Sequence, residues 1–137
     1  DLAGLEISKT IFNVNYFSAT ELVKKFVEKG LARVLFINSI SGKSPQSGQG
    51  QYSASKHALQ AYSETLAKFS VGGDFDVMSI NPGGIDSELW ENSDILTKNI
   101  TDKFIQPKSL AKLVYAFLEL PPKTYIKYAA IIPVHDV

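Results

Sequence analysis

The chain has 137 residues, of which 45% are hydrophobic and 20% are charged, a balance typical of a globular domain with a packed core. Fourteen basic and fourteen acidic residues cancel to a net charge of zero. This argues against a nucleic-acid partner, because phosphate binding needs a basic excess. The lack of cysteine excludes disulfides and thiolate catalysis, and two histidines, His57 and His135, are too few to predict a metal site.

The chain shows no targeting or membrane signal. Its first residues lack the basic stretch and apolar run of a signal peptide, and no apolar stretch is long enough to span a bilayer. We therefore expect a cytoplasmic protein that does not insert into a membrane.

The first predicted elements are a helix and a strand. Apolar residues recur at steps of three and four over residues 8–29, which indicates one face of a helix, and Gly30 is a favourable stop. Residues 33–37 are continuous and apolar, a pattern typical of a strand buried on both faces. Residues 38–50 are rich in serine, glycine and glutamine and predict a loop.

The same alternation continues to the end of the chain. Residues 51–70 predict a second helix, 75–80 a second strand, and 86–90 a short helical turn. Pro107 opens a third helix that ends before Pro121, and residues 126–132 predict a third strand. Strands that alternate with helices predict an α/β fold with a doubly wound parallel sheet of about three strands.

Two loops stand at the edge where such sheets bind ligands. In an open parallel sheet, ligands bind beyond the carboxyl ends of the strands. Asn38-Ser39 follows the first predicted strand, and Asn81-Pro82-Gly83-Gly84 follows the second. We therefore expect the chemistry of this chain at these two loops.

Tyr52 and Lys56 form the central candidate pair. They are four residues apart on a predicted helix, so both side chains lie on one face. A nearby ammonium favours the phenolate, which allows a tyrosine to act as general acid or base on an alcohol or carbonyl. The same spacing also occurs on exposed helix faces without a function. Ser39 could hydrogen-bond a substrate carbonyl beside the tyrosine, or it could simply belong to a strand-terminal turn.

In combination these residues resemble the short-chain dehydrogenase/reductase family, in particular its single-domain branch. The resemblance rests on Ser39, on Tyr52-Ser53-Ala54-Ser55-Lys56 and on residues 81–87, which read NPGGIDS. Residues 12–16 resemble the helix that carries the family's catalytic asparagine, with Asn15 at the matching position. The resemblance covers residues 5–120 and implies a Rossmann-like fold. It also implies an NAD(P)-dependent oxidoreductase that interconverts a carbonyl and a secondary alcohol.

The resemblance also implies a role for each residue. Tyr52 would donate or accept the proton, and Lys56 would favour the phenolate and bind the nicotinamide ribose. Ser39 would orient the substrate oxygen, and Asn15 would hold a water that links Lys56 to solvent. The residues that would line the nicotinamide are Pro82, Gly83, Ile85 and Ser87. Ser87 stands where the family usually has threonine, and either hydroxyl can bond the carboxamide.

The family's Gly-rich cofactor fingerprint is missing. Neither Gly42-Lys43-Ser44 nor Gly48-Gln49-Gly50 completes a phosphate-binding motif. We therefore expect residues 1–137 to be the C-terminal catalytic portion of a single domain, in which NAD and NADP cannot be distinguished. Strand 33–37 would then lack a neighbour, so we expect the chain alone to be marginally stable or self-associating.

Other interpretations remain open. The resemblance implies a homo-oligomer, since the family packs the helices at 8–29 and 51–70 against a second subunit. The chain could also be a non-catalytic fragment or dimerisation module. It could also be an epimerase or dehydratase with a related Tyr/Lys pair, which residues 81–87 favour less. The polar segment 88–106 corresponds to the family's substrate cover. Trp90 either belongs to that cover or packs elsewhere, and His57 is expected to be structural.

Overall fold

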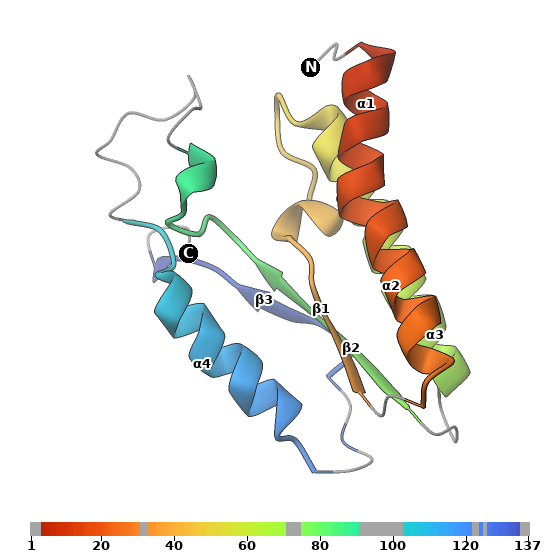
Figure 1. The fold of residues 1–137 in the computed structure, drawn as a ribbon. Helices are drawn as coiled ribbons and strands as arrows, with labels where there is room; N and C mark the ends of the chain where they lie inside the picture. The colour runs from red at the N-terminus through yellow and green to blue at the C-terminus, as the bar shows by residue number, and fades with distance from the viewer. Residues whose placement is uncertain are drawn as a thin grey trace.

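The computed structural model contains an open sheet of three parallel strands (Figure 1). The strands are β1 (Arg33–Ile37), β2 (Asp76–Pro82) and β3 (Ala129–Ile131), and β2 is central. The residues that the structure describes are 4–30, 33–70, 75–90, 103–121, 124 and 126–134. Most of the predicted substrate cover, over 91–102, and His135 lie outside them.

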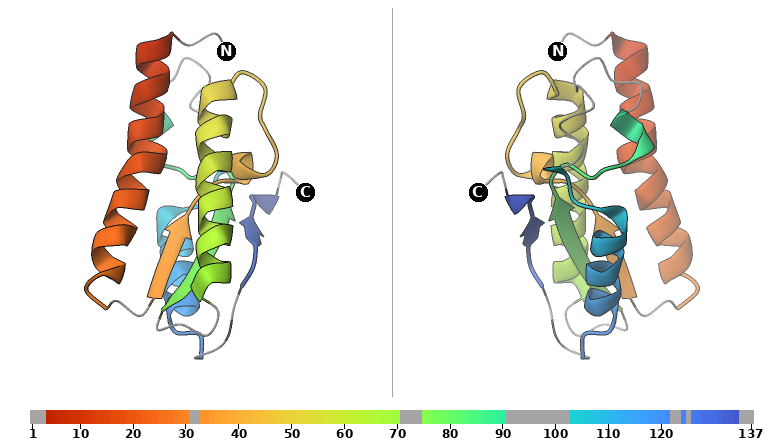
Figure 2. Two further views of the ribbon diagram at one scale, coloured as in Figure 1. Left: turned by 90° about the vertical axis from the view of Figure 1, so that its right-hand side faces the viewer. Right: turned by 90° about the vertical axis from the view of Figure 1, so that its left-hand side faces the viewer.

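Helices cover both faces of this sheet (Figures 1 and 2). One face carries α1 (Leu5–Phe12), α2 (Ser18–Val27) and α3 (Gly50–Ser70), and the other carries α4 (Pro107–Leu118). The predicted α/β class and the order helix, strand, helix, strand, helix, strand are therefore confirmed. The expected turn at 86–90 is the 3₁₀ turn η3 (Glu88–Trp90).

The first helix differs from its prediction in length and in kind. It begins at Leu5, and a π turn, η1 (Asn13–Phe17), joins α1 to α2. In this turn the Ser18 N–H donates to the Asn13 carbonyl, one residue further back than in an α-helix. Figure 2 shows α1 and α2 as one continuous rod beside α3.

The central strand extends further than predicted. β2 runs in register with β1 from Arg33↔Asp76 to Ile37↔Ile80, and it continues to Pro82 beside β3. The Gly83 N–H donates to the Ile131 carbonyl at 2.8 Å. Because the Gly83 N–H points to β3, the nitrogen of Pro82 points to the opposite side, toward β1. β1 has already ended at this level, so the missing N–H of Pro82 costs no hydrogen bond of the sheet. β3 is shorter than the predicted 126–132.

The main core lies between the sheet and the helices α2 and α3. It consists of five buried apolar residues: Val23, Phe36, Leu59, Ala67 and Val77. Phe36 and Tyr62 meet edge to face at 6.2 Å between ring centroids, and Tyr62 meets Tyr16 in the same way at 6.0 Å. These contacts hold α3 against the sheet. They thereby position the first turns of α3 at the carboxyl edge of the sheet.

Arg33 ties the opposite end of the sheet to α4. Its Nη1 donates to the carbonyls of Leu118 and Leu120 at 2.8 and 2.7 Å, which satisfies groups that the helix end leaves unpaired. Its Nη2 pairs with Asp76 Oδ2 at 2.8 Å. Among the described residues, no helix has both the length and the apolar character to cross a bilayer.

Candidate active site

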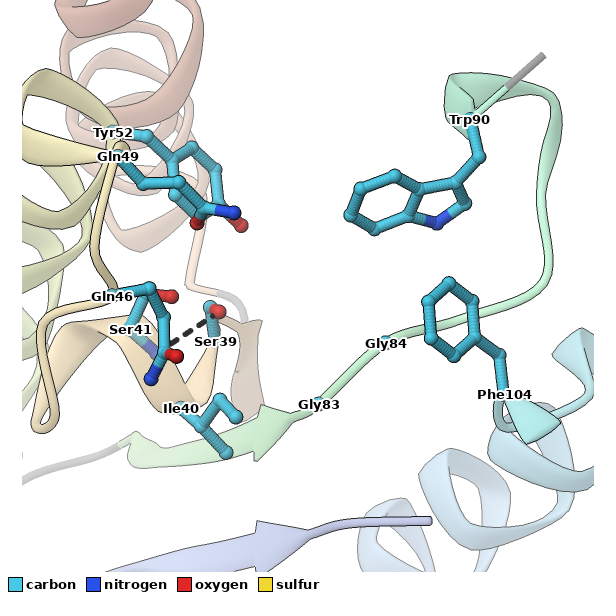
Figure 3. A pocket seen from close by; sticks show the side chains of 10 residues that line it. All are labelled: Ser39, Ile40, Ser41, Gln46, Gln49, Tyr52, Gly83, Gly84, Trp90 and Phe104. Atoms are coloured by element: carbon cyan, nitrogen blue, oxygen red, sulfur yellow. Dashed lines mark hydrogen bonds between the residues drawn. The ribbon is translucent and has the colours of Figure 1, made fainter. Parts of the chain in front are cut away.

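Two adjoining pockets open at the carboxyl edge of the sheet. The larger, of about 390 Å³, is lined by Ser39, Ile40, Ser41, Gln46, Gln49, Tyr52, Gly83, Gly84, Trp90 and Phe104 (Figure 3). The smaller, of about 110 Å³, is lined by Asn38, Ser39, Tyr52, Pro82, Gly83, Ile85, Ser87 and Trp90. Because Ser39 and Tyr52 line both, they lie at the boundary between the two pockets.

A backbone donor positions the Ser39 hydroxyl. Ser39 is buried directly before the 3₁₀ turn η2 (Ile40–Gly42). Its Oγ accepts the Ser41 N–H at 3.1 Å, drawn as the dashed line in Figure 3. This bond uses the oxygen as an acceptor, so the Ser39 O–H proton remains free to be donated toward the pocket.

Tyr52 and Lys56 occupy successive turns near the start of α3. The Lys56 Nζ lies 5.7 Å from the centre of the Tyr52 ring, within the range of a cation–π interaction. Burial lowers the pKa of Lys56 from its ordinary value, because desolvation disfavours the ammonium form. The helical spacing thus brings a cation to the ring, as the sequence predicts.

Asn38 and Gly42 hold this part of α3 against the end of β1. The Asn38 Nδ2 donates to the Lys56 carbonyl at 3.1 Å and to Gln60 Oε1 at 3.0 Å. A Cβ added at Gly42 would lie 2.8 Å from Asn38 Nδ2 and 2.9 Å from the Lys56 carbonyl oxygen. The approach therefore requires glycine. Asn38 belongs to a loop at which the sequence predicts chemistry, but neither Asn38 nor Gly42 is among the predicted site residues.

Asn15 reaches the site through a hydrogen-bond chain. Its Nδ2 donates to Ser55 Oγ at 3.0 Å, and Ser55 Oγ donates to the Tyr52 carbonyl at 2.7 Å. Ser55 is fully buried. Asn15 is therefore joined to the turn that carries Tyr52, but it lines neither of the two pockets.

The predicted nicotinamide-lining residues converge on the smaller pocket. Pro82, Gly83, Ile85 and Ser87 all line it beside Ser39 and Tyr52. A Cβ added at Gly83 would lie 3.1 Å from the ring of Pro133, so the close approach of Gly83 to the segment after β3 favours glycine. Trp90, whose role the sequence left open, lines both pockets. The sequence assigned no role to Phe104, which lines the larger pocket.

Comparisons with known proteins show which family and which fold the chain shares. The sequence profile of a family described as short chain dehydrogenase matches residues 4–95. The chain is 31% identical over 94 residues to a Drosophila melanogaster protein named dehydrogenase/reductase SDR family protein 7-like. The match covers 66% of this chain and 29% of that protein. The chain thus spans about a third of the length of such relatives.

Solved structures share the fold. An alcohol dehydrogenase from Thermococcus sibiricus, complexed with 5-hydroxy-NADP, matches 97% of this chain and 56% of its own with a TM-score of 0.80 at 20% identity. A 4-hydroxyisoleucine dehydrogenase mutant, complexed with NADH and succinate, matches 95% of this chain and 59% of its own with a TM-score of 0.77 at 21% identity. At these identities the likeness is one of fold.

Proposed function

Because this chain belongs to the short-chain dehydrogenase/reductase family, we propose that it is the catalytic portion of an NAD(P)-dependent oxidoreductase that interconverts a carbonyl and a secondary alcohol. The observation that carries the proposal is the position of Ser39 and Tyr52 at the boundary of two pockets. The smaller pocket would receive the nicotinamide and the larger one the substrate. The two hydroxyls then lie where a substrate oxygen would meet the cofactor.

Each hydroxyl has a distinct task in this proposal. Tyr52 exchanges the proton of the alcohol oxygen as general acid or base. Ser39 donates its O–H to the same oxygen and stabilises the negative charge that grows there during reduction. The Ser41 N–H keeps the Ser39 oxygen in place. Both tasks need fixed geometry, and both residues are held by elements of the core.

Lys56 supports Tyr52 by electrostatics. Its Nζ lies 5.7 Å from the Tyr52 ring centre, so a cationic group stands beside the ring whose hydroxyl carries the proton in this proposal. The burial that lowers the pKa of Lys56 also eases release of its own proton, which suits a group that passes protons on. Asn15 would hold the water that connects Lys56 to solvent, and its link to Ser55 keeps it beside this turn.

The smaller pocket is suited to a nicotinamide ring. Because Gly83 has no side chain, a flat ring can approach its backbone closely, and the Ser87 hydroxyl can hydrogen-bond a carboxamide. The Ile85 N–H has no hydrogen-bond partner among the described residues and could bind the carboxamide oxygen. When bound, the cofactor would supply or accept the hydride. Relatives of this fold are complexed with NADH or with a form of NADP, so either cofactor is compatible with the proposal.

Replacement of Tyr52 tests the proposed chemistry directly. In the native gene product, Tyr52→Phe removes the hydroxyl but keeps the ring, so turnover of ketones should fall by about 10²-fold or more. Cofactor affinity, measured by fluorescence titration with reduced nicotinamide, should change little. If Tyr52→Phe turned over ketones at the normal rate, the proton would not pass through Tyr52.

A second candidate is a non-catalytic dimerisation module. The rod α1–η1–α2 supports it, because five of its large apolar side chains are more than half exposed: Leu5, Ile7, Val14, Phe17 and Leu22. Such a face suits a second subunit whether or not the site is active. Titration with oxidised and reduced cofactors separates the candidates, since a module without catalysis should bind neither.

A further inference from the structure

The larger pocket has two unlike walls. Figure 3 shows Trp90 and Phe104 on one side of the cavity and Gln46 and Gln49, with Tyr52, on the other. We call Trp90 and Phe104 the aromatic wall, and Gln46 and Gln49 the amide wall. A substrate held between them must satisfy both.

The aromatic wall is fixed in place by its surroundings. The Trp90 Nε1–H donates to the Ile85 carbonyl at 2.7 Å, and the Trp90 and Phe104 rings lie 5.3 Å apart at 53°. A Cβ at Gly84 would lie 2.7 Å from two atoms of the Phe104 ring, so this ring rests directly on glycine backbone. The Ile105 N–H donates to the Gly84 carbonyl at 2.9 Å and anchors the segment that carries Phe104. The rings are therefore preorganised to receive a flat group.

The amide wall offers neutral hydrogen-bonding groups. The Gln46 N–H donates to Ser53 Oγ of α3 at 3.3 Å, and its Nε2 donates to the Ser44 carbonyl of its own loop at 3.0 Å. The Gln49 side chain makes no hydrogen bond with another described residue and lies along the cavity in Figure 3. Each amide can both donate and accept.

None of the ten described residues that line this pocket has a charged side chain. A charged substrate would therefore lose hydration here without gaining an ion partner among these residues, which is costly. An aryl group, in contrast, gains ring contacts with Trp90 and Phe104 in offset or edge-to-face geometry. The walls thus discriminate by charge and by shape.

We propose that the larger pocket selects neutral aryl ketones, or the corresponding alcohols, whose ring carries an uncharged hydrogen-bonding substituent. The ring lies against the aromatic wall, the substituent meets Gln46 and Gln49, and the carbonyl faces Ser39 and Tyr52. The inference rests on the oxidoreductase function proposed above, and it makes the four wall residues determinants of specificity.

The first test compares matched ketones in the native gene product with its cofactor. Acetophenone should have a kcat/KM about tenfold above that of cyclohexyl methyl ketone, and para-acetylbenzamide should exceed para-acetylbenzoate by at least as much. Trp90→Leu and Phe104→Leu should each bring the aryl-to-cyclohexyl ratio close to one. Phe69→Leu, an equivalent change at an exposed position of α3, should leave the ratio unchanged.

The amide wall is tested by the same ratios. Gln46→Leu and Gln49→Leu should each lower the kcat/KM of para-acetylbenzamide relative to acetophenone by about tenfold, because a substituent without a partner loses its hydrogen bond. Equal kcat/KM values for aryl and cyclohexyl ketones, or ratios that the four wall variants do not move, would overturn the inference and leave the oxidoreductase function standing.

A binding measurement separates this inference from the proposed function. Trp90 is the sole tryptophan among the 137 residues, and the part of the emission that Trp90→Phe removes reports on the aromatic wall. para-Acetylbenzamide should quench it saturably, and the quench should vanish in Trp90→Phe. Binding of this kind without turnover of any ketone would support the pocket inference and overturn the proposed reaction. Absence of a saturable quench would overturn the inference whatever the activity.

Discussion

At the scale of single residues, Ser39 is held by backbone rather than by another side chain. Because the Ser41 N–H uses its oxygen as an acceptor, the Ser39 proton is free to be donated, in our proposal to the substrate oxygen. We expect Ser39→Ala to lower kcat by about 10²-fold with little change in KM, since the lost donor acts mainly on charge that develops in the transition state. Steady-state kinetics with a ketone substrate measure this.

Two variants sharpen the result for Ser39. Ser39→Thr keeps a hydroxyl and should retain part of the activity. Ser44→Ala changes an exposed serine of the same loop and should behave as wild type. A Ser39→Ala enzyme with unchanged kcat would show that this hydroxyl does not contact the reacting oxygen.

Residues near a strand end or on one helix face could be predicted from the sequence, and residues that act across the fold could not. Ser39 directly follows an apolar strand, and Tyr52 shares a helix face with Lys56, so both signals are local. Gly42 matters because its Cα approaches the backbone of α3. Phe104 matters because it crosses to Gly84. Neither contact produces a hydrophobic periodicity or a local motif from which it could be predicted.

At the scale of elements, the Asn15–Ser55 hydrogen bond docks the π turn on α3. In a double-mutant cycle, Asn15→Ala and Ser55→Ala should show a coupling free energy of unfolding of about 1 kcal/mol, because either change removes the same bond. Urea denaturation of the four proteins measures it. The pair Ser18→Ala and Ser55→Ala should be additive, since Ser18 bonds the Val14 carbonyl within its own helix. Additivity of the Asn15 pair would contradict the docking role.

The π turn itself could not be read from the sequence. Apolar residues at steps of three and four, such as Phe12, Tyr16 and Ala19, persist through a turn that holds one extra residue. The pattern therefore predicts one continuous α-helix over 8–29. The helix, its apolar face and its neighbour α3 were predictable, whereas the direction in which the turn presents Asn15 was not.

A second contact between elements predicts a pH dependence. Lys43, directly after η2, pairs with Glu64 of α3 at 2.5 Å, and hydrogen bonds from Lys43 and then Gln60 lower the pKa of Glu64. A carboxyl whose pKa is lower in the folded state stabilises the protein above its unfolded pKa. This stabilisation should be lost as the pH falls from 4.5 through the folded value.

Glu64→Gln removes the titrating group and provides the comparison. The variant should be less stable than wild type at pH 7, and the difference in free energy of unfolding should shrink as the pH falls below 4.5. Urea denaturation at a series of pH values measures this difference. A difference that stays constant through the acid range would show that the Lys43–Glu64 pair does not contribute.

At the scale of the whole molecule, the sheet has an open edge at β1 and an apolar groove beside it. Within the part of the chain that the structure describes, β1 pairs with β2 alone, and Ile37 at its end is 49% exposed. On α4, Tyr115 and Leu118 are 63% and 44% exposed. A groove of about 370 Å³ joins these residues to Ile85, Pro107, Leu110, Ala111 and Val114.

Open edges and contiguous apolar surfaces promote association, because another chain can pair with the strand and bury the groove. We therefore expect the 137-residue chain, expressed alone, to sediment as concentration-dependent oligomers rather than as a monomer. Ile37→Lys combined with Leu118→Lys places charge at both parts of this surface and should shift the chain toward monomer. Sedimentation velocity over a range of concentrations tests both statements. A wild-type chain that sediments as a monomer and unfolds cooperatively would show that this edge and groove tolerate exposure to water.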